Sequence, residues 1–172
     1  MSSPTTRSLD LTDQDVTEIA AIPARMATSW NRGDADGFAA PFTETADFVA
    51  FEGTHLGGRD EIAAFHRPLF ATDLAGSRVE AEVRWVRPLD SRWALMHAGA
   101  SVILPGEDEA SPGRDSMQLF VATRRATGWM IEAMQNSRQL TLERQRFLDG
   151  IDAAPPEARR RVLYLLATLT EP

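Results

Sequence analysis

The sequence predicts an α+β domain whose helices and strands occupy separate halves of the chain. Apolar residues recur at helical spacing up to about residue 71, and one strand-like run, Asp47–Phe51, interrupts them. From Arg78 onward the period changes to the alternation that is typical of antiparallel strands. Because helices and strands are segregated in this way, we expect the helices to cover one face of a curved sheet.

The first helix runs from an N-cap at Thr12 or Asp13 to Gly33, which is suited to the position just past a helix end. Pro23 lies inside this segment and removes a backbone hydrogen bond. The apolar stripe keeps its phase through the proline. This favours one helix kinked at Pro23 over a second helix that starts there.

Two more helices and four strands complete the domain. Asp34 is placed to cap a short helix, and a glycine-marked connection leads into a third helix that ends near Ala71. The four strands are separated by turn residues, with a polar hairpin loop before the third. They are expected at residues 78–88, 92–104, 115–125 and 129–137.

Composition and charge exclude several classes of function. The chain has a formal net charge of −7, which argues against a nucleic-acid-binding face because such a face needs a basic stripe. It contains no cysteine and no lysine, so thiol catalysis, cysteine metal sites and Schiff-base chemistry have no side chain to use. The sequence shows no apolar leader and no apolar run of membrane length, so we expect a cytoplasmic protein that does not enter membranes.

The chain is expected to divide into three parts. Residues 1–11 are rich in Ser and Thr and predict a flexible arm, residues 12–138 form the folded domain, and residues 139–172 form a helical extension. Within the extension, Pro155 and Pro156 break one helix and can begin another. The apolar stripe of the extension packs either on its own domain or on a neighbouring subunit.

Four stretches of the chain carry a family resemblance: SWNRGDADGFAAPFTETADFVAF, then EGTHLGGRDEIAAFH, then the PG-containing hairpin loop, then GWMIEAMQNSR. Together they resemble the NTF2-like superfamily, in its SnoaL-like branch, and more narrowly its SgcJ/EcaC type. The resemblance implies a cone-shaped sheet wrapped around the first helix, a pocket inside the cone and a homodimer built through the sheet. It also implies a link to polyketide or enediyne biosynthesis. No nucleotide-binding motif is present, so no cofactor is expected, and an enzyme of this kind would be a cofactor-independent isomerase, cyclase or hydratase.

The histidines are the candidate acid–base residues. His66 lies on the apolar face of the third helix, where a neutral imidazole is suited to proton transfer, although a core histidine is the alternative. His97 lies on a strand whose two faces both look buried, so it faces the pocket or the core. His55 lies in the glycine-marked connection, with Glu52 three residues earlier as a candidate partner. The histidine spacing lacks the pattern of a helical metal site, so no metal is expected.

Aromatic and amide side chains are the candidate ligand-binding residues. Trp30 ends the apolar stripe of the first helix and would suit an aromatic ligand. Alternation from Trp129 places Gln135 on the inward side of the last strand and Asn136 in the opposite phase, while Gln118 lies on the strand before. A buried amide needs hydrogen-bond partners, so these residues contact a ligand or form a structural network.

The resemblance also indicates what the site lacks. Related steroid isomerases have a catalytic aspartate near the end of the first strand, and this position falls on Ala50 here. We therefore expect the pocket to bind a hydrophobic small molecule of polyketide or enediyne type, with acid–base chemistry at His66 or His97. The alternatives are a non-catalytic ligand carrier and a dimerisation or assembly module.

Overall fold

The computed structural model describes residues 11–110, 112–139 and 155–160, and it confirms the α+β fold. The chain forms two compact units, Met1–Gln139 and Leu140–Pro172. In the second unit the described residues are 155–160, of which 156–160 are helical. The expected flexible arm and most of the expected extension lie outside the described residues. Within the described ranges, no helix is both long enough and apolar enough to cross a bilayer.

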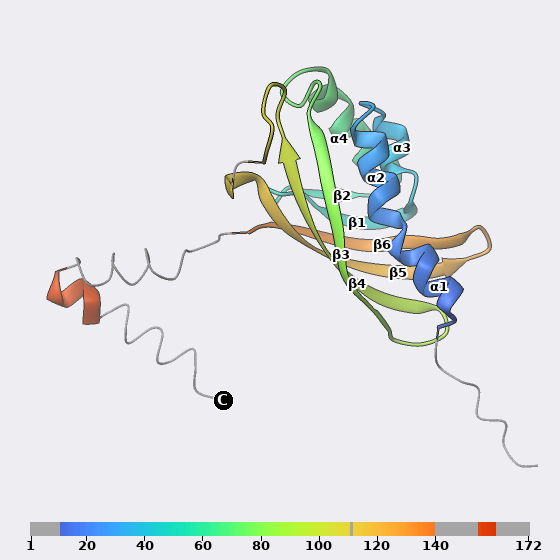
Figure 1. Cartoon of the computed structure of the whole chain (residues 1–172). Coiled ribbons are helices and arrows are strands. Elements are labelled where there is room, and N and C mark those ends of the chain that lie inside the picture. The colour runs from blue at the N-terminus through green and yellow to red at the C-terminus, as the bar shows by residue number, and fades with distance from the viewer. Residues whose placement is uncertain (1–10, 111, 140–154, 161–172) are drawn as a thin grey trace, which may run out of the picture. The chain divides into compact units, whose positions relative to one another are not determined.

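One curved sheet forms the frame of the first unit, with six strands within the described residues in the order β2-β1-β6-β5-β4-β3. Neighbouring strands are antiparallel except β1 and β6, which are parallel. In Figure 1, β3 and β4 run steeply across β1 and β2, which shows how strongly the sheet is twisted. The strands are β1 (Phe42–Val49), β2 (His55–Gly57), β3 (Arg78–Pro88), β4 (Trp93–Ile103), β5 (Asp115–Arg125) and β6 (Gly128–Arg138).

Two helices, α1 (Asp13–Ala20) and α2 (Ile22–Trp30), replace the single kinked helix that the sequence favoured. Thr12 caps α1 through a reciprocal capping box with Asp15. Pro23 lies in the first turn of α2, where a missing N–H breaks no helical hydrogen bond. The proline is therefore accommodated by a new helix rather than by a kink.

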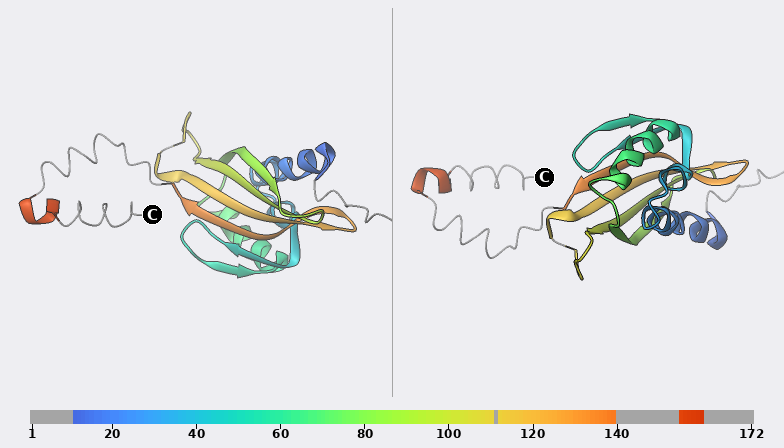
Figure 2. Two further views of the ribbon diagram at one scale, coloured as in Figure 1. Left: turned by 90° about the horizontal axis from the view of Figure 1, so that it is seen from below. Right: turned by 90° about the horizontal axis from the view of Figure 1, so that it is seen from above.

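Two further helices, α3 (Ala35–Ala39) and α4 (Arg59–Ala71), continue the helical layer. The Asp34 side chain accepts a hydrogen bond from the N–H of Gly37, as the sequence predicted for the cap of α3. Helices α2, α3 and α4 pack in succession, and α4 lies beside β1 and β2 (Figure 2). Strand β1 begins at Phe42, earlier than predicted, because pairing with β6 already starts there.

Two bulges change which side chains face inward. In β3, the pairing with β4 shifts between Val83 and Trp85, and the Trp85 side chain is 43% exposed. In β6, one extra residue lies between Ile131 and Ala133, opposite adjacent residues of β5. A bulge turns every later side chain of a strand to the other face. Simple alternation, counted across these points, assigns the wrong face.

The core lies between the helices and the inner face of the sheet, and its largest fully buried side chains include Phe42, Phe48, Phe120, Ile62 and Ile131. One polar network is buried beside it. The Asp15 carboxylate accepts hydrogen bonds from Thr12 and from Trp129 Nε1, the latter at 3.0 Å, and it pairs with Arg124. This network joins α1 to the hairpin of β5 and β6.

Candidate functional site

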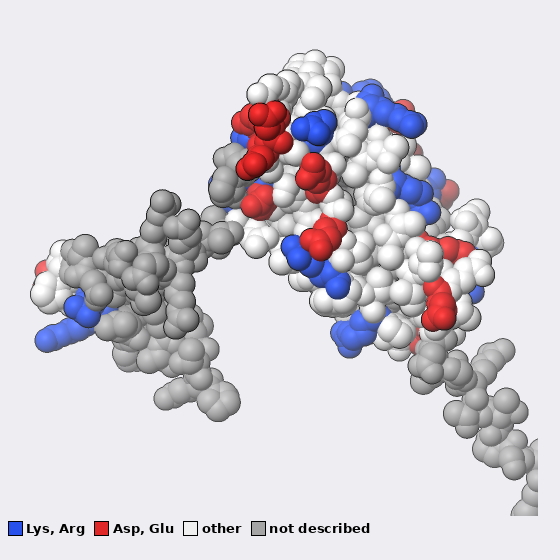
Figure 3. All heavy atoms as spheres, in the orientation of Figure 1, with Lys and Arg blue, Asp and Glu red and all other residues white. Residues whose placement is uncertain are grey.

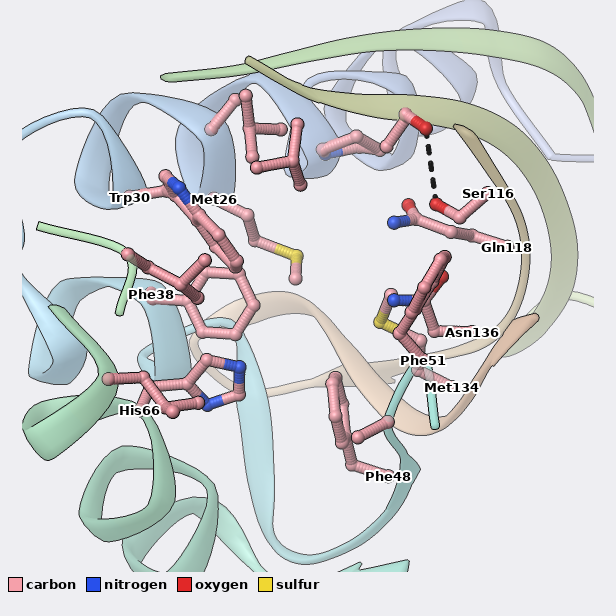
Figure 4. A pocket seen from close by; sticks show the side chains of 18 of the residues that line it. Met26, Trp30, Phe38, Phe48, Phe51, His66, Ser116, Gln118, Met134 and Asn136 are labelled. Atoms are coloured by element: carbon pink, nitrogen blue, oxygen red, sulfur yellow. Dashed lines mark hydrogen bonds between the residues drawn. The ribbon is translucent and has the colours of Figure 1, made fainter. Parts of the chain in front are cut away.

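A cavity of about 290 Å³ lies between the helices and the inner face of the sheet (Figure 4). This volume is close to the lower end, about 300 Å³, of the usual range for small-molecule pockets. Most of its lining is apolar and aromatic, from α2, α3 and α4 and the loop after β1. The polar side chains that line it are Glu52, His66, Arg114, Ser116, Gln118 and Asn136.

His66 belongs both to the core and to the cavity wall. Its side chain extends from α4, only 4% of its surface is exposed, and it lines the cavity. The Phe38 ring lies 4.4 Å from the imidazole, between ring centroids, and the Phe48 ring lies 5.6 Å away. The two roles that the sequence left open therefore coexist in one residue.

Hydrogen bonding determines which tautomer of His66 is present. Nδ1 lies 2.8 Å from the carbonyl oxygen of Ile62, and since a carbonyl only accepts, Nδ1 carries the proton. In the neutral ring Nε2 then has a lone pair, and none of the described residues donates a hydrogen bond to it. Burial lowers the pKa of His66, while the bond to Ile62 and the nearby Glu52 carboxylate partly offset this effect. The ring is therefore a neutral hydrogen-bond acceptor at neutral pH.

The opposite wall carries amides from two adjacent strands. Gln118 of β5 and Asn136 of β6 are direct cross-strand partners, and both line the cavity. Figure 4 shows them together with Ser116, across the space from His66. Asn136 Oδ1 is buried without a hydrogen-bond partner among the described residues. An unpaired buried amide oxygen is costly, which makes this wall a candidate contact for a polar ligand group.

Gln135 does not line the cavity, which corrects the inward position predicted for it. The bulge between Ile131 and Ala133 reverses the alternation counted from Trp129, so Met134 and Asn136 face inward instead. Gln135 is exposed, and its Nε2 lies 3.4 Å from the Ser137 hydroxyl. Asn136, which the sequence placed in the opposite phase, is the amide of this strand that lines the cavity.

His97 also lies outside the cavity, on the outer face of the sheet. Its ring stacks on Trp85, with centroids 5.0 Å apart and planes 1° apart. The inward phase of β4 is taken by small and apolar side chains, including Met96 and Ala98. The half-buried apolar residues of the outer phase made both faces of this strand look buried in the sequence.

The loop at the cavity rim separates the predicted pair of Glu52 and His55. Glu52 lines the cavity, but the side chain of His55 is 61% exposed and is absent from the lining. His55 Nε2 lies 2.8 Å from Asp47 Oδ1 on the neighbouring strand, so its partner is Asp47. Trp30 lines the cavity, as its place on the helical stripe predicted, and its Nε1 donates to Ser77 at 2.9 Å.

Sequence reasoning missed Arg114 and, apart from Trp30, the aromatic residues that surround the cavity. Arg114 follows the hairpin loop, and its Nε donates to the Val102 carbonyl oxygen at 3.0 Å. Its Nη2 pairs with Glu107 in the same loop. Nothing in a lone arginine after a polar loop indicates a cavity. The spacing of Phe38 after the Asp34 cap, in contrast, could have placed its ring on the inner face of α3.

Ala50 lines the cavity where the resemblance placed the aspartate of steroid isomerases. No carboxylate therefore occupies that position, and Glu52, two residues later, lies at the rim. Among the described residues, no group of three His, Asp or Glu side chains is close enough to hold a metal ion. The polar chemistry of the cavity comes from one imidazole, three neutral polar side chains and two charged residues.

Comparisons with known proteins give the same fold. The chain is 52% identical to a domain of unknown function with a cystatin-like fold from Nostoc punctiforme, with 92% of this chain and 98% of that chain covered and a TM-score of 0.75. Residues 139–172 make up about a fifth of the chain, so a match of this extent continues past residue 139.

More distant structures share the fold alone. An NTF-2 like protein from Shewanella oneidensis is 15% identical, with 70% of this chain and 97% of that chain covered and a TM-score of 0.60. Aln2 from Streptomyces is 21% identical, with 71% and 89% covered and a TM-score of 0.60. No family model and no protein of curated function matches the chain.

Proposed function

We propose that this chain, which belongs to the family of the Nostoc punctiforme domain of unknown function with a cystatin-like fold, binds an apolar small molecule in its cone cavity. The observation that carries the proposal is the cavity itself, in which His66 Nε2 and the Asn136 amide oxygen lack hydrogen-bond partners among the described residues. Buried polar groups that lack hydrogen-bond partners beside an apolar cavity are expected where a bound ligand supplies those partners.

The ligand class that we propose is a natural-product intermediate of polyketide or enediyne type. Support comes from the resemblance of the chain to the SnoaL-like branch and the SgcJ/EcaC type. The cavity volume of about 290 Å³ favours a compact ring system over a long chain. We also propose that the protein is located in the cytoplasm.

His66 is the residue that we propose for proton transfer. Its unprotonated Nε2 can accept a proton from a ligand, and Gln118 and Asn136 can hold a polar group on the facing wall. Such chemistry would need no cofactor and would be of isomerase, cyclase or hydratase type. The alternative is a carrier that binds the same ligand without turnover. In that case replacement of His66 changes affinity, and no conversion of the ligand accompanies binding.

A cavity-filling substitution tests the binding site. Ala27 lines the cavity from α2, and Ala24 of the same helix is exposed and absent from the lining. We expect calorimetric titration with (naphthalen-1-yl)methanol to show one site in the wild type and in Ala24→Phe, and a large loss of binding in Ala27→Phe. Equal binding to both variants would place the ligand elsewhere, and no binding to the wild type would refute the proposal.

We also propose that the protein is a homodimer built through the outer face of the sheet. Trp85, His97 and Leu119 are consecutive partners across β3, β4 and β5, and Trp85 and Leu119 are 43% and 37% exposed. An apolar row of this kind is suited to a second copy of the same row. Light scattering of Leu119→Glu should give half the wild-type mass, while Val16→Glu, at an exposed apolar position on α1, should not. An unchanged mass for Leu119→Glu would count against the dimer.

A further inference from the structure

We propose that the cavity selects an apolar ligand whose polar end is a protonated amine, and rejects ligands that carry a carboxylate or a phosphate. This inference rests on the proposed function and specifies its ligand. The Glu52 carboxylate and the unprotonated Nε2 of His66 line the cavity, and neither has a hydrogen-bond partner among the described residues. The cationic side chain of the lining, Arg114, already pairs with Glu107.

Arg114 is the only cationic side chain among the described residues that line the cavity, and its charge is already paired with a carboxylate. Nε donates to the Val102 carbonyl oxygen at 3.0 Å, and Nη2 pairs with Glu107. The Leu104 N–H and Arg114 hold the pKa of Glu107 below its usual range, so this carboxylate stays ionised. An anionic ligand would therefore meet a positive charge that Glu107 already neutralises, and the Glu107 carboxylate would repel it.

Glu52 is the second charged residue of the lining, and it is uncommitted. No described residue forms a hydrogen bond or an ion pair with its carboxylate. Glu52 is close enough to His66 for its charge to raise the pKa of the imidazole, although burial dominates and the net effect is a lowered pKa. The carboxylate and the unprotonated Nε2 are thus two acceptors within electrostatic reach of each other, and an ammonium group supplies donors for both.

Aromatic rings surround the space between these acceptors and the sheet. Trp30, Phe38 and Phe48 border it in Figure 4, and Phe51 and Phe65 also line it. The negative faces of aromatic rings attract ammonium groups, and the attraction grows when the cation is desolvated. Phe51 already binds one cation from outside the cavity, since the Arg138 guanidinium lies 4.9 Å from the ring centroid. The apolar lining therefore suits a cation as well as an apolar ring.

The charge around the site favours the same ligand. The chain has a net charge of −7, and the loop that carries Glu107 also carries the exposed Asp108 and Glu109. Figure 3 shows acidic side chains gathered on the part of the first unit where this loop lies. Because Arg114 connects the loop to the cavity lining, this negative potential lies near the site and attracts cations toward it.

Three naphthalene compounds that carry different polar groups test the preference for an amine separately from ligand binding itself. We would titrate the full chain at neutral pH with (naphthalen-1-yl)methylamine, (naphthalen-1-yl)methanol and 1-naphthoate, and measure each affinity by calorimetry. We expect the amine to bind about fivefold or more tighter than the alcohol, and the carboxylate to bind weakest. If the alcohol or the carboxylate binds as tightly as the amine, the inference fails while ligand binding stands. If none of the probes binds, the proposed function fails.

A variant that removes the negative charge of Glu52 tests whether this carboxylate causes the preference for the amine. Glu52→Gln should lower the affinity for the amine about fivefold and leave the affinity for the alcohol within about twofold. Glu44→Gln makes the same change at an exposed position of β1 outside the cavity lining, and it should alter neither affinity. An equal loss in both variants would mean that net charge alone attracts the amine. An unchanged amine affinity in Glu52→Gln would overturn the role of this carboxylate.

Discussion

His66 donates its Nδ1–H to the carbonyl oxygen of Ile62, one helical turn earlier, across 2.8 Å. This bond determines which nitrogen is left for chemistry, because the neutral imidazole then carries its lone pair on Nε2. The aromatic rings around His66 keep water from it, and the resulting burial lowers its pKa. The residue is therefore prepared to accept a hydrogen bond or a proton from a ligand in the cavity.

The first prediction concerns stability and pH. Because the folded pKa of His66 lies below its ordinary value of 6.5, the unfolded chain binds the proton more readily. Stability should therefore be highest above this value and should fall as the pH drops below it. We expect the urea midpoint of the wild type to fall more between pH 7.5 and pH 5.5 than that of His66→Phe. If the urea midpoints of the two proteins fall equally with pH, burial does not lower the pKa of His66.

The second prediction concerns the acceptor role of Nε2. His66→Phe keeps an aromatic ring at the site but removes one hydrogen bond to the ligand. We expect the affinity for (naphthalen-1-yl)methanol, measured by calorimetry, to fall about fivefold, which corresponds to about 1 kcal/mol for one hydrogen bond. His97→Phe makes the same change on the outer face of the sheet and should leave the affinity unchanged. A loss of equal size in both variants would point to a general effect on the fold.

Sequence reasoning recovered the fold because the main signals were local. The helical stripe that ends at Trp30, the Asp34 cap and the four late strands each depend on residues close together in the chain. The same locality placed Trp30 and His66 on the apolar faces of their helices, and both residues line the cavity. Whether a buried helical histidine also borders a cavity depends on the strands opposite it, and no local pattern contains that information.

The errors at Gln135 and His97 have two physical causes. Bulges at Val83/Trp85 and Ile131/Ala133 are set by how strands pair, so alternation along one strand gave Gln135 the position that Asn136 holds. His97 was ambiguous because the outer face of β4 is half-buried and therefore reads as apolar. In both cases the missing information is tertiary.

The third prediction tests the buried network around Asp15. Hydrogen bonds from Trp129 and Thr12, together with the Arg124 charge, lower the pKa of this carboxyl to about 2, against the opposing effect of burial. A lowered carboxyl pKa stabilises the fold above the ordinary value of 3.8, and this stability is lost as the pH falls toward 2. We expect Asp15→Asn to cost about 2 kcal/mol at neutral pH in urea unfolding, with a cost that shrinks below pH 4.

Asp13→Asn provides the matched control for this network. Asp13 is exposed in the first turn of the same helix and contributes no side chain to the network. Its replacement should change the free energy of unfolding by less than about 0.5 kcal/mol. A cost for Asp15→Asn that stays constant down to pH 3 would show that geometry, and not the charge of Asp15, stabilises this contact.

The fourth prediction concerns the turn that positions α4 and hence His66. Gly58 has a φ of 85°, and a Cβ atom there would lie 2.5 Å from the Glu44 carbonyl oxygen. Gly58→Ala should therefore lower the free energy of unfolding by more than about 2 kcal/mol. Gly106 has a φ of 84° with no atom within 4 Å of such a Cβ, so Gly106→Ala should cost about 1 kcal/mol. Equal costs in urea unfolding would mean that the close approach to Glu44 relaxes.

The most direct test of the cavity as a binding site is a crystal structure of the protein soaked with (naphthalen-1-yl)methylamine. We expect the naphthalene ring among Trp30, Phe38 and Phe48, with the amine nitrogen within hydrogen-bond distance of His66 Nε2 or the Glu52 carboxylate. A ligand found only on the outer face of the sheet, beside Trp85 and His97, would contradict a binding function for the cavity. A cavity that stays empty at a saturating concentration of the amine would contradict it as well.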